Sequence, residues 1–317
     1  MNQLRIVTRP DFDGVVCAVL LLEAMAIERP VKWVQPDEVQ QTGIDIDERD
    51  ILANLPFDPR CGLWFDHHYS NIPTHQFQGA FQLAPSAARV IYNYYRNRFN
   101  GRFCRLVKKA DKIDSADFTV EDVLHPENDP YFLLSLTLPH TTPGLSETAY
   151  VEKVVSLLRN TDIHGVLTDD DVRKRCSNTI EQDRQFKVLL KSRTRLKDRV
   201  SLTDYRPIHP LQKGNRFLIY TLFPDMLAAI EICYRDERKE RVRISVGHNI
   251  FNRVCRVNIG RMLSEYGGGG HREAGGCTLR ANEVDRYLPR IIQTLIENEP
   301  NEDTDPMTDD PLSVQSA

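Results

Sequence analysis

The alternation of short apolar segments with turns and helices constrains the fold of this chain most strongly. Over the first hundred residues, runs rich in Val, Ile, Leu and Phe end at polar turns, and a long apolar helix follows the first of them. Strands that alternate with helices predict a mostly parallel sheet. The predicted strands are 4–9, 31–36, 50–56 and 62–68, and the predicted helices are 15–28 and, capped by Ser86, 86–99. In such a sheet ligands bind beyond the carboxyl ends of the strands, so the residues that follow each strand are the first candidates for a site.

A second pattern begins after residues 201–215, where two prolines and a glycine interrupt a helical, charged region. The later segments predict strands at 216–223 and 241–248 and helices at 225–232, 257–266 and about 282–297. The expected fold is therefore α/β with two domains, which fits a length of 317 residues. Residues 1–200 would hold the mostly parallel sheet with flanking helices, residues 201–296 a smaller α/β domain, and the active cleft would lie between them.

Charge is distributed unevenly along the chain. The net charge is −4, but no Lys or Arg follows Arg290, and the segment 297–317 carries seven acidic residues. Removing those seven charges leaves +3 for residues 1–296, so 297–317 is predicted to be an acidic, disordered tail. A mildly basic body is compatible with a phosphorylated substrate, whereas a general DNA-binding protein would carry a stronger basic stripe.

The cysteines and the apolar segments indicate in which cellular compartment the protein is expected. Seven cysteines are scattered without a Cys-x-x-Cys pair, which favours reduced thiols and argues against a disulfide scaffold or a cysteine zinc site. The longest apolar run, 15–27, contains Glu23 and is too short to span a bilayer. The first ten residues predict a strand and not a signal peptide. We therefore expect a cytoplasmic protein without a membrane partner.

Two polar clusters follow predicted strands. Asp11 and Asp13 stand at i and i+2 after the first strand, and Asp66, His67 and His68 end the fourth. Carboxylates suit hard divalent cations, and manganese also accepts imidazole ligands. The alternative for the first cluster is a polar turn whose aspartate caps the next helix. Because the two clusters fall at the same edge of the predicted sheet, we favour a metal site.

A third acidic group lies at Asp111, Asp114 and Asp117. The i, i+3 spacing puts Asp111 and Asp114 on one side of a helix or turn. Some of these carboxylates are candidate metal ligands, and the others are ordinary surface charges.

The strongest local signal is the run Gly267, Gly268, Gly269, Gly270 and His271, which two further glycines follow. Consecutive glycines cost backbone entropy, so a folded domain keeps them where the main chain approaches another group closely or adopts positive φ. Exposed backbone N–H groups of such a run can bind anions, and His271 and Arg253 can add charge-assisted hydrogen bonds to phosphate. A flexible linker is the weaker alternative, since a helix and a strand flank the run.

The order Asp-x-Asp, then Asp-His-His, then a later Asp, then Gly-Gly-Gly-Gly-His resembles the DHH phosphoesterase superfamily, in the branch that joins the DHH domain to its associated C-terminal domain. That branch includes nanoRNases, the RecJ nuclease and exopolyphosphatase-like proteins. The resemblance covers about residues 4–290, with about 200 residues between the two later motifs. It implies a phosphohydrolase that uses two divalent cations, usually Mn²⁺ with Mg²⁺ or Co²⁺ as alternatives, to activate water.

By this resemblance, each motif residue takes a role. The implied metal ligands are Asp11, Asp13, Asp66, His67 and Asp111, with Asp114 as the alternative to Asp111. Asp66, His67 and His68 form the catalytic cluster, and His68, Arg253, Gly268, Gly269, Gly270 and His271 bind the substrate. The substrate would be a short oligonucleotide, a cyclic dinucleotide or polyphosphate, and assembly into a homodimer is compatible with the sequence.

The sequence departs from the family pattern at two positions. Val7 stands where the family has a histidine ligand, and Asn54 stands where it has the aspartate that bridges both metals. Asp58, four residues after Asn54, is a candidate substitute. A neutral amide bridges two dications poorly, which leaves a second hypothesis: a non-catalytic nucleotide-binding or phosphate-binding protein with a degraded two-metal site.

Overall fold

The computed structural model describes residues 3–40, 43–139, 141–208 and 214–301. The chain divides into two compact units, and the first contains the residues up to Ser192 together with a later segment that ends at Leu222. The second unit begins at Arg193 and takes up the chain again at Phe223. The predicted boundary between residues 200 and 201 would cut strand β7 (Val200–Asp204). Most of the predicted acidic tail, residues 302–317, lies outside the described residues.

The first unit contains a parallel five-stranded sheet with the order β2-β1-β3-β4-β5. Its strands are β1 (Arg5–Thr8), β2 (Lys32–Trp33), β3 (Asp50–Ala53), β4 (Leu63–Asp66) and β5 (Gly79–Phe81). Neighbouring residues of β1 belong to different apolar clusters. Ile6 packs in the cluster of helix α1 (Phe12–Ala24), and Val7 packs in one that contains Trp64. Both faces of the sheet are thus covered, as a parallel sheet requires. The mostly parallel sheet and the α/β class predicted from sequence are confirmed.

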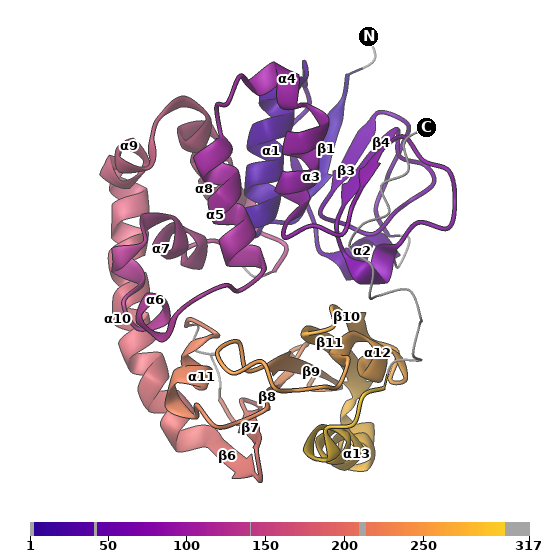
Figure 1. Ribbon diagram of the computed structural model, residues 1–317, viewed down its shortest axis with the longest axis vertical. Coiled ribbons are helices and arrows are strands. Elements are labelled where there is room, and N and C mark those ends of the chain that lie inside the picture. Colours follow the sequence, from indigo (N-terminus) through magenta and orange to yellow (C-terminus); the bar gives the residue numbers. More distant parts are fainter. Residues whose placement is uncertain (1–2, 41–42, 140, 209–213, 302–317) are drawn as a thin grey trace. The chain divides into compact units, whose positions relative to one another are not determined.

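Helix α1 (Phe12–Ala24) is the centre of the helical layer, and eleven of its thirteen residues are buried. It contacts α3, α5 and α8, which gather with it on one side of the sheet strands (Figure 1). Burial all round explains why this segment is apolar on every face. The other helices of the unit are α2 (Pro36–Gln40), α3 (Ala87–Tyr94), α4 (Arg96–Phe99), α5 (Cys104–Asp114), α6 (Val120–Leu124), α7 (Pro130–Leu136), α8 (Leu145–Asn160), α9 (Ile163–Thr168), α10 (Asp170–Arg193) and α11 (Leu218–Leu222), with 3₁₀ turns at Tyr69–Asn71 and Pro126–Asn128.

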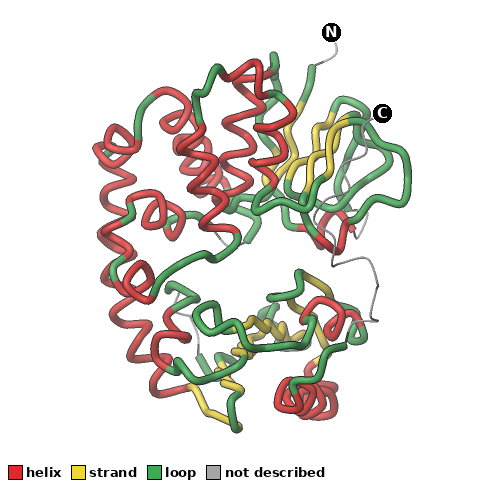
Figure 2. The backbone as a smooth tube through the Cα atoms, in the orientation of Figure 1, coloured by secondary structure: helices red, strands yellow, loops and turns green. Residues whose placement is uncertain are grey.

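The other face of the sheet is covered mainly by loops and the short helix α2, as Figure 2 shows. Trp64 is fully buried there, stacks on Phe81 with ring centroids 5.5 Å apart, and donates from Nε1 to the carbonyl of Leu55 at 2.8 Å. This smaller cluster holds the loop before β4 against the strands. Because Trp64 belongs to β4, this cluster also holds β4 in place, directly before the polar residues that follow the strand.

The second unit contains a six-stranded mixed sheet with the order β10-β11-β9-β8-β7-β6. Among the described strands of this sheet, β7 and β8 pair in parallel and the other neighbours pair antiparallel. Its elements are β6 (Thr194–Lys197), β7, β8 (Ala228–Tyr234), β9 (Arg241–His248), α12 (Ile259–Ser264), β10 (Gly269–Gly270), β11 (Ala274–Arg280), a 3₁₀ turn at Ala281–Glu283, and α13 (Val284–Glu297). Buried side chains of β8, β9 and β11 form an apolar core with those of α12 and α13.

Two predicted elements near the start of this region are wrong. The segment predicted as a strand, 216–223, contains helix α11, and the segment predicted as a helix, 225–232, forms most of strand β8. Apolar runs this short do not distinguish a buried strand from a buried helix by periodicity. The segment forms strand β8 because it pairs with β7 on one side and with β9 on the other.

No helix in the described part of the chain is long and apolar enough to cross a membrane.

Asp183 in α10 gives the fold a pH dependence that can be measured. Its side chain is buried, it accepts from the Asn215 backbone N–H at 2.7 Å, and burial raises its pKa to about 6. When the pKa of a carboxyl is higher in the folded than in the unfolded protein, its ionisation destabilises the fold. The folded protein therefore loses stability as pH rises from about 4 through about 6. We expect Asp183→Asn to remove this loss and to stabilise the fold at pH 7 by on the order of 2 kcal/mol. Thermal unfolding of both proteins from pH 4.5 to 7.5 tests this, and parallel pH curves would contradict it.

Candidate metal centre

Three neighbouring strands bring polar residues to one edge of the parallel sheet. Asp11 and Asp13 follow β1, Asn54 follows β3, and Asp66 is the last residue of β4. Because β1, β3 and β4 are adjacent and parallel, their carboxyl ends lie at the same edge. The predicted meeting of the Asp-x-Asp and Asp-His-His motifs follows from this topology.

Asp13 is the most constrained carboxylate of the site. Its side chain is buried in the first turn of α1, and its two oxygens accept from the backbone N–H groups of Ala87 and Ala88 at 2.9 Å each. These groups form the N-terminus of α3, which Ser86 caps as predicted from sequence, and a helix N-terminus favours a negative charge. Burial, with Asp114 and Asp11 nearby, nevertheless raises the pKa of Asp13 well above its usual range. The charge of Asp13 is thus only partly compensated by the protein.

His67 turns one ring nitrogen toward two carboxylates. Its Nδ1 lies 2.9 Å from the carbonyl oxygen of Ala84, and since a carbonyl only accepts, Nδ1 carries the proton. In the neutral ring Nε2 then bears the lone pair, and it lies 3.3 Å from Asp114 Oδ2 and 3.9 Å from Asp13 Oδ2. One ligand atom each from Asp13, His67 and Asp114 lies within 4.8 Å of the others. A neutral His67 would place this lone pair against two carboxylates, an arrangement that a divalent cation between them satisfies, so these three residues fit a divalent cation.

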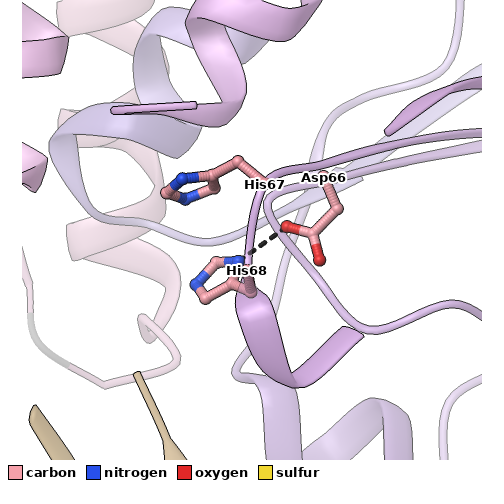
Figure 3. Close-up of side chains that lie close together, drawn as sticks. All are labelled: Asp66, His67 and His68. Carbon is pink, nitrogen blue, oxygen red and sulfur yellow. Dashed lines mark hydrogen bonds and ion pairs between the residues drawn. The ribbon is translucent and has the colours of Figure 1, made fainter. Parts of the chain in front are cut away.

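Asp66 and His68 form the second half of the Asp-His-His motif. Asp66 is fully buried, and its two oxygens accept from His68 Nδ1 and from Asn71 Nδ2 at 2.6 Å each. Figure 3 shows the hydrogen bond from His68 to Asp66, and the ring of His67 lies against the ring of His68, with ring centroids 4.4 Å apart. Ligand atoms of Asp66, His67 and His68 also lie within 4.8 Å of one another. Asp66 therefore orients His68 at the border of the metal centre.

Of the three acidic residues at 111–117, the structure brings Asp114 to the centre and not Asp111. The Asp111 carboxylate accepts from Ser86 Oγ at 2.7 Å and forms an ion pair with Arg89. It thus steadies the start of α3, whose amides hold Asp13. Burial raises the pKa of Asp114, which His67 partly offsets. This geometry favours the alternative, Asp114, over Asp111 as the candidate metal ligand, and Asp117 is exposed.

Asp11 caps helix α1, as the polar-turn alternative predicts, and its role as a metal ligand stays a prediction. As the N-cap of α1 it accepts from the Gly14 backbone N–H at 2.9 Å. The same oxygen, Oδ1, accepts from Asn54 Nδ2 at 3.0 Å, and Oδ2 lies 3.1 Å from Arg9 Nε in an ion pair. Asp11 thus lies beside the metal centre with its oxygens already committed to protein groups.

The two departures from the family pattern have distinct surroundings. Val7 is fully buried in the apolar cluster around Trp64, so a histidine there would displace core packing. Asn54 is fully buried beside Asp11, with φ 57°, a left-handed conformation that asparagine tolerates better than most residues. Asp58, the candidate substitute, is held by Arg60 at 2.7 Å, an ion pair that lowers its pKa. Its carboxylate is thus already paired with a guanidinium of its own loop.

The glycine run forms a tight turn in the second unit. Gly269 and Gly270 form strand β10, which pairs with β11. Gly270 has φ 145°, a backbone conformation that residues other than glycine rarely adopt. The His271 backbone N–H donates to the Ala274 carbonyl at 2.7 Å. Arg253 is exposed, and its Nε donates to the carbonyl of Ile250 at 3.1 Å. The run belongs to a different unit from the metal centre, so its joint action with that centre stays a prediction.

A glycine of α12 permits the close approach of this run. A Cβ on Gly260 would lie 2.5 Å from the Gly270 carbonyl oxygen and 2.9 Å from that of His271. We expect Gly260→Ala to displace the run, to lower the stability of the second unit by about 1–3 kcal/mol, and to raise KM for a substrate bound there. Gly144→Ala, whose Cβ would meet open space, is the control in unfolding and kinetic measurements. Equal behaviour of the two variants would contradict the expectation.

Sequence reasoning missed several residues that the structure places around the centre. The sequence analysis names no role in the site for Arg9, for Asn71 or for the backbone amides of Ala87 and Ala88. Arg9 and Asn71 stand close in sequence to the motifs, which is the only signal that pointed to them. The amides carry no side-chain signal, and only the predicted helix start at Ser86 marked their place.

No family model and no curated protein matches the chain. Among solved structures, the pGpG-specific phosphodiesterase PggH from Vibrio cholerae is 30% identical, covers 94% of this chain and 100% of its own, and has a TM-score of 0.72. RecJ from Thermus thermophilus, solved in complex with Mn²⁺, is 11% identical, covers 93% of this chain and 52% of its own, and has a TM-score of 0.55. The second likeness is one of fold alone.

The likeness to PggH extends over almost the whole chain and includes both units. The resemblance drawn from the Asp-x-Asp, Asp-His-His and glycine motifs is therefore confirmed. The chain belongs to the DHH phosphoesterase superfamily of hydrolases.

Proposed function

We propose that this protein hydrolyses the phosphodiester bond of a short linear dinucleotide of the pGpG type, with a divalent cation at Asp13, His67 and Asp114. The observation that carries the proposal is the 30% identity to the pGpG-specific phosphodiesterase over 94% of the chain. The converging carboxylates and imidazole supply the chemistry that such a reaction needs. Mn²⁺ is the first choice of cation, because the ligand set mixes oxygen and imidazole.

A divalent cation bound there would neutralise phosphoryl charge and lower the pKa of a bound water. The chain's own residues prepare its place. The Ala84 carbonyl fixes the His67 tautomer, so Nε2 is the ligand atom, and the amides at the start of α3 hold Asp13 in one orientation. Asp66 holds His68 through Nδ1, which orients its ring to contact a substrate phosphate. In the second unit, His271 and the glycine run would grip another phosphate of the substrate.

The test is a substrate panel with the full-length chain. We expect hydrolysis of pGpG with Mn²⁺, slower hydrolysis of other linear dinucleotides, and little turnover of cyclic dinucleotides or polyphosphate. Chelation should abolish the activity, and Mn²⁺ should restore it better than Mg²⁺ or Co²⁺. Absence of turnover with all three cations across the panel would contradict the proposed function.

A second candidate is a non-catalytic nucleotide-binding protein, and Asn54 is the observation that favours it. A neutral amide stands where the family has a bridging carboxylate, and it is fully buried beside Asp11. Binding of pGpG without turnover, by protein that carries no tightly bound cation, would support this candidate. A homodimer and a cytoplasmic location stay predictions from the sequence.

A further inference from the structure

The surroundings of Asp11 differ from those of Asp13 in a way that bears on how many cations the site holds. Asp11 Oδ1 already accepts two hydrogen bonds, from the Gly14 N–H and from Asn54 Nδ2. Its other oxygen faces the guanidinium of Arg9 at 3.1 Å. Arginine stays charged at any physiological pH. The negative charge of Asp11 is therefore offset by a permanent cation of the chain itself.

Asn54 reinforces this difference. Its side chain is fully buried, and its Nδ2 is fixed by donation to Asp11. Its Oδ1 has no hydrogen-bond partner among the described residues. A buried acceptor without a partner is costly, so it marks a place for one donor, such as a water. An amide oxygen carries no net charge, however, and it cannot bridge two dications as a carboxylate does.

Asp66 has no carboxylate oxygen that is without a hydrogen-bond donor in the described structure. Both of its oxygens accept short hydrogen bonds, from His68 and from Asn71. Asp13 also accepts two backbone hydrogen bonds, but one of its oxygens and one of Asp114 additionally lie 3.9 Å and 3.3 Å from His67 Nε2. In contrast to Asp11, neither Asp13 nor Asp114 forms an ion pair with an arginine or a lysine of the described residues.

We propose that this chain holds one tightly bound divalent cation, at Asp13, His67 and Asp114, and that Arg9, with Asn54, takes the place of a second. Arg9 lies partly exposed beside Asp11, with 27% of its side chain accessible, so its guanidinium can meet a phosphate oxygen. It would supply to the substrate the positive charge that a second cation supplies elsewhere. The inference rests on the proposed function for its cation, but not on turnover.

The experiment counts metal ions on the intact protein. Isothermal titration with MnCl₂, elemental analysis after gel filtration and electron paramagnetic resonance are measured on the wild type and on Asn54→Asp. We expect one Mn²⁺ per wild-type chain with an uncoupled six-line spectrum. Asn54→Asp should take up a second Mn²⁺, and the two should be spin-coupled, since ions in two-metal sites lie about 3.5–4 Å apart.

Asn100→Asp is the matched control. Asn100 is also a left-handed asparagine, with φ 47°, but it is exposed at the end of α4, so the variant should keep one Mn²⁺. Two tightly bound, coupled Mn²⁺ in the wild type would overturn the proposal without any variant, and so would a folded Asn54→Asp that keeps one. One Mn²⁺ without hydrolysis of pGpG would contradict the proposed function alone, whereas two with hydrolysis would contradict this inference alone.

Arg9→Gln tests the second half of the inference. The variant keeps a polar side chain but loses the fixed charge beside Asp11. We expect Mn²⁺ affinity at the first site to change less than about threefold, and kcat for pGpG to fall by about 10²-fold or more. Unchanged kcat and KM in Arg9→Gln would overturn the role assigned to Arg9, while the cation count would still test the single site.

Discussion

Replacing Asp114 by asparagine is expected to weaken Mn²⁺ binding by at least about 100-fold and to abolish hydrolysis of pGpG. The reason is that Asp114 is one of two carboxylates that face His67 Nε2, so a neutral amide removes half of the charge that attracts a cation. The metal-free variant should be at least as stable as the wild type, because one of two facing negative charges is gone. Titration calorimetry with MnCl₂ and thermal unfolding measure both effects.

Asp111→Asn is the informative comparison, because it changes the residue that sequence reasoning preferred. Asp111 pairs with Arg89 and Ser86 at the start of α3, so its loss should cost about 1 kcal/mol of stability and less than about tenfold in Mn²⁺ affinity. The exposed Asp117→Asn should behave as the wild type in both measurements. If Asp111→Asn weakened Mn²⁺ binding more than Asp114→Asn, the assignment of Asp114 would be wrong.

The two histidines of the Asp-His-His motif are expected to fail in different ways when each is replaced by alanine. His67→Ala removes the nitrogen that faces Asp13 and Asp114, so Mn²⁺ binding and turnover should both be lost. His68→Ala removes the ring that Asp66 orients, so Mn²⁺ affinity should stay within about threefold while kcat/KM falls by about 10²–10³-fold.

Calorimetry with MnCl₂ and steady-state kinetics with pGpG separate these two outcomes. His75→Ala is the control, because His75 is an exposed histidine of the same unit. Loss of Mn²⁺ binding in His68→Ala with normal binding in His67→Ala would reverse the assigned roles. The comparison also distinguishes a metal ligand from a residue that acts on substrate, because only the former changes the cation affinity.

Elements with a strong local signal could be predicted from the sequence. Helix α1 is apolar over its whole length, and Ser86 caps α3, whose N–H at Arg89 donates to the Ser86 hydroxyl at 3.0 Å. The prediction of a helix at 225–232 is wrong because the side chains of this segment suit a buried helix and a buried strand equally. The segment became strand β8 through pairing with strands on both sides, and such pairing is not encoded in the segment itself.

The sequence by itself determined the superfamily, the parallel sheet and the strand ends at which polar residues gather. These depend on local alternation and on motifs whose order along the chain is distinctive. Only the tertiary structure decided that Asp114 and not Asp111 faces His67, and that Arg9 and Asn54 occupy both oxygens of Asp11. Two aspartates three residues apart on α5 cannot be told apart from the sequence. The packing of α5 against α1 and α3 places Asp114 beside His67 and Asp111 beside Arg89.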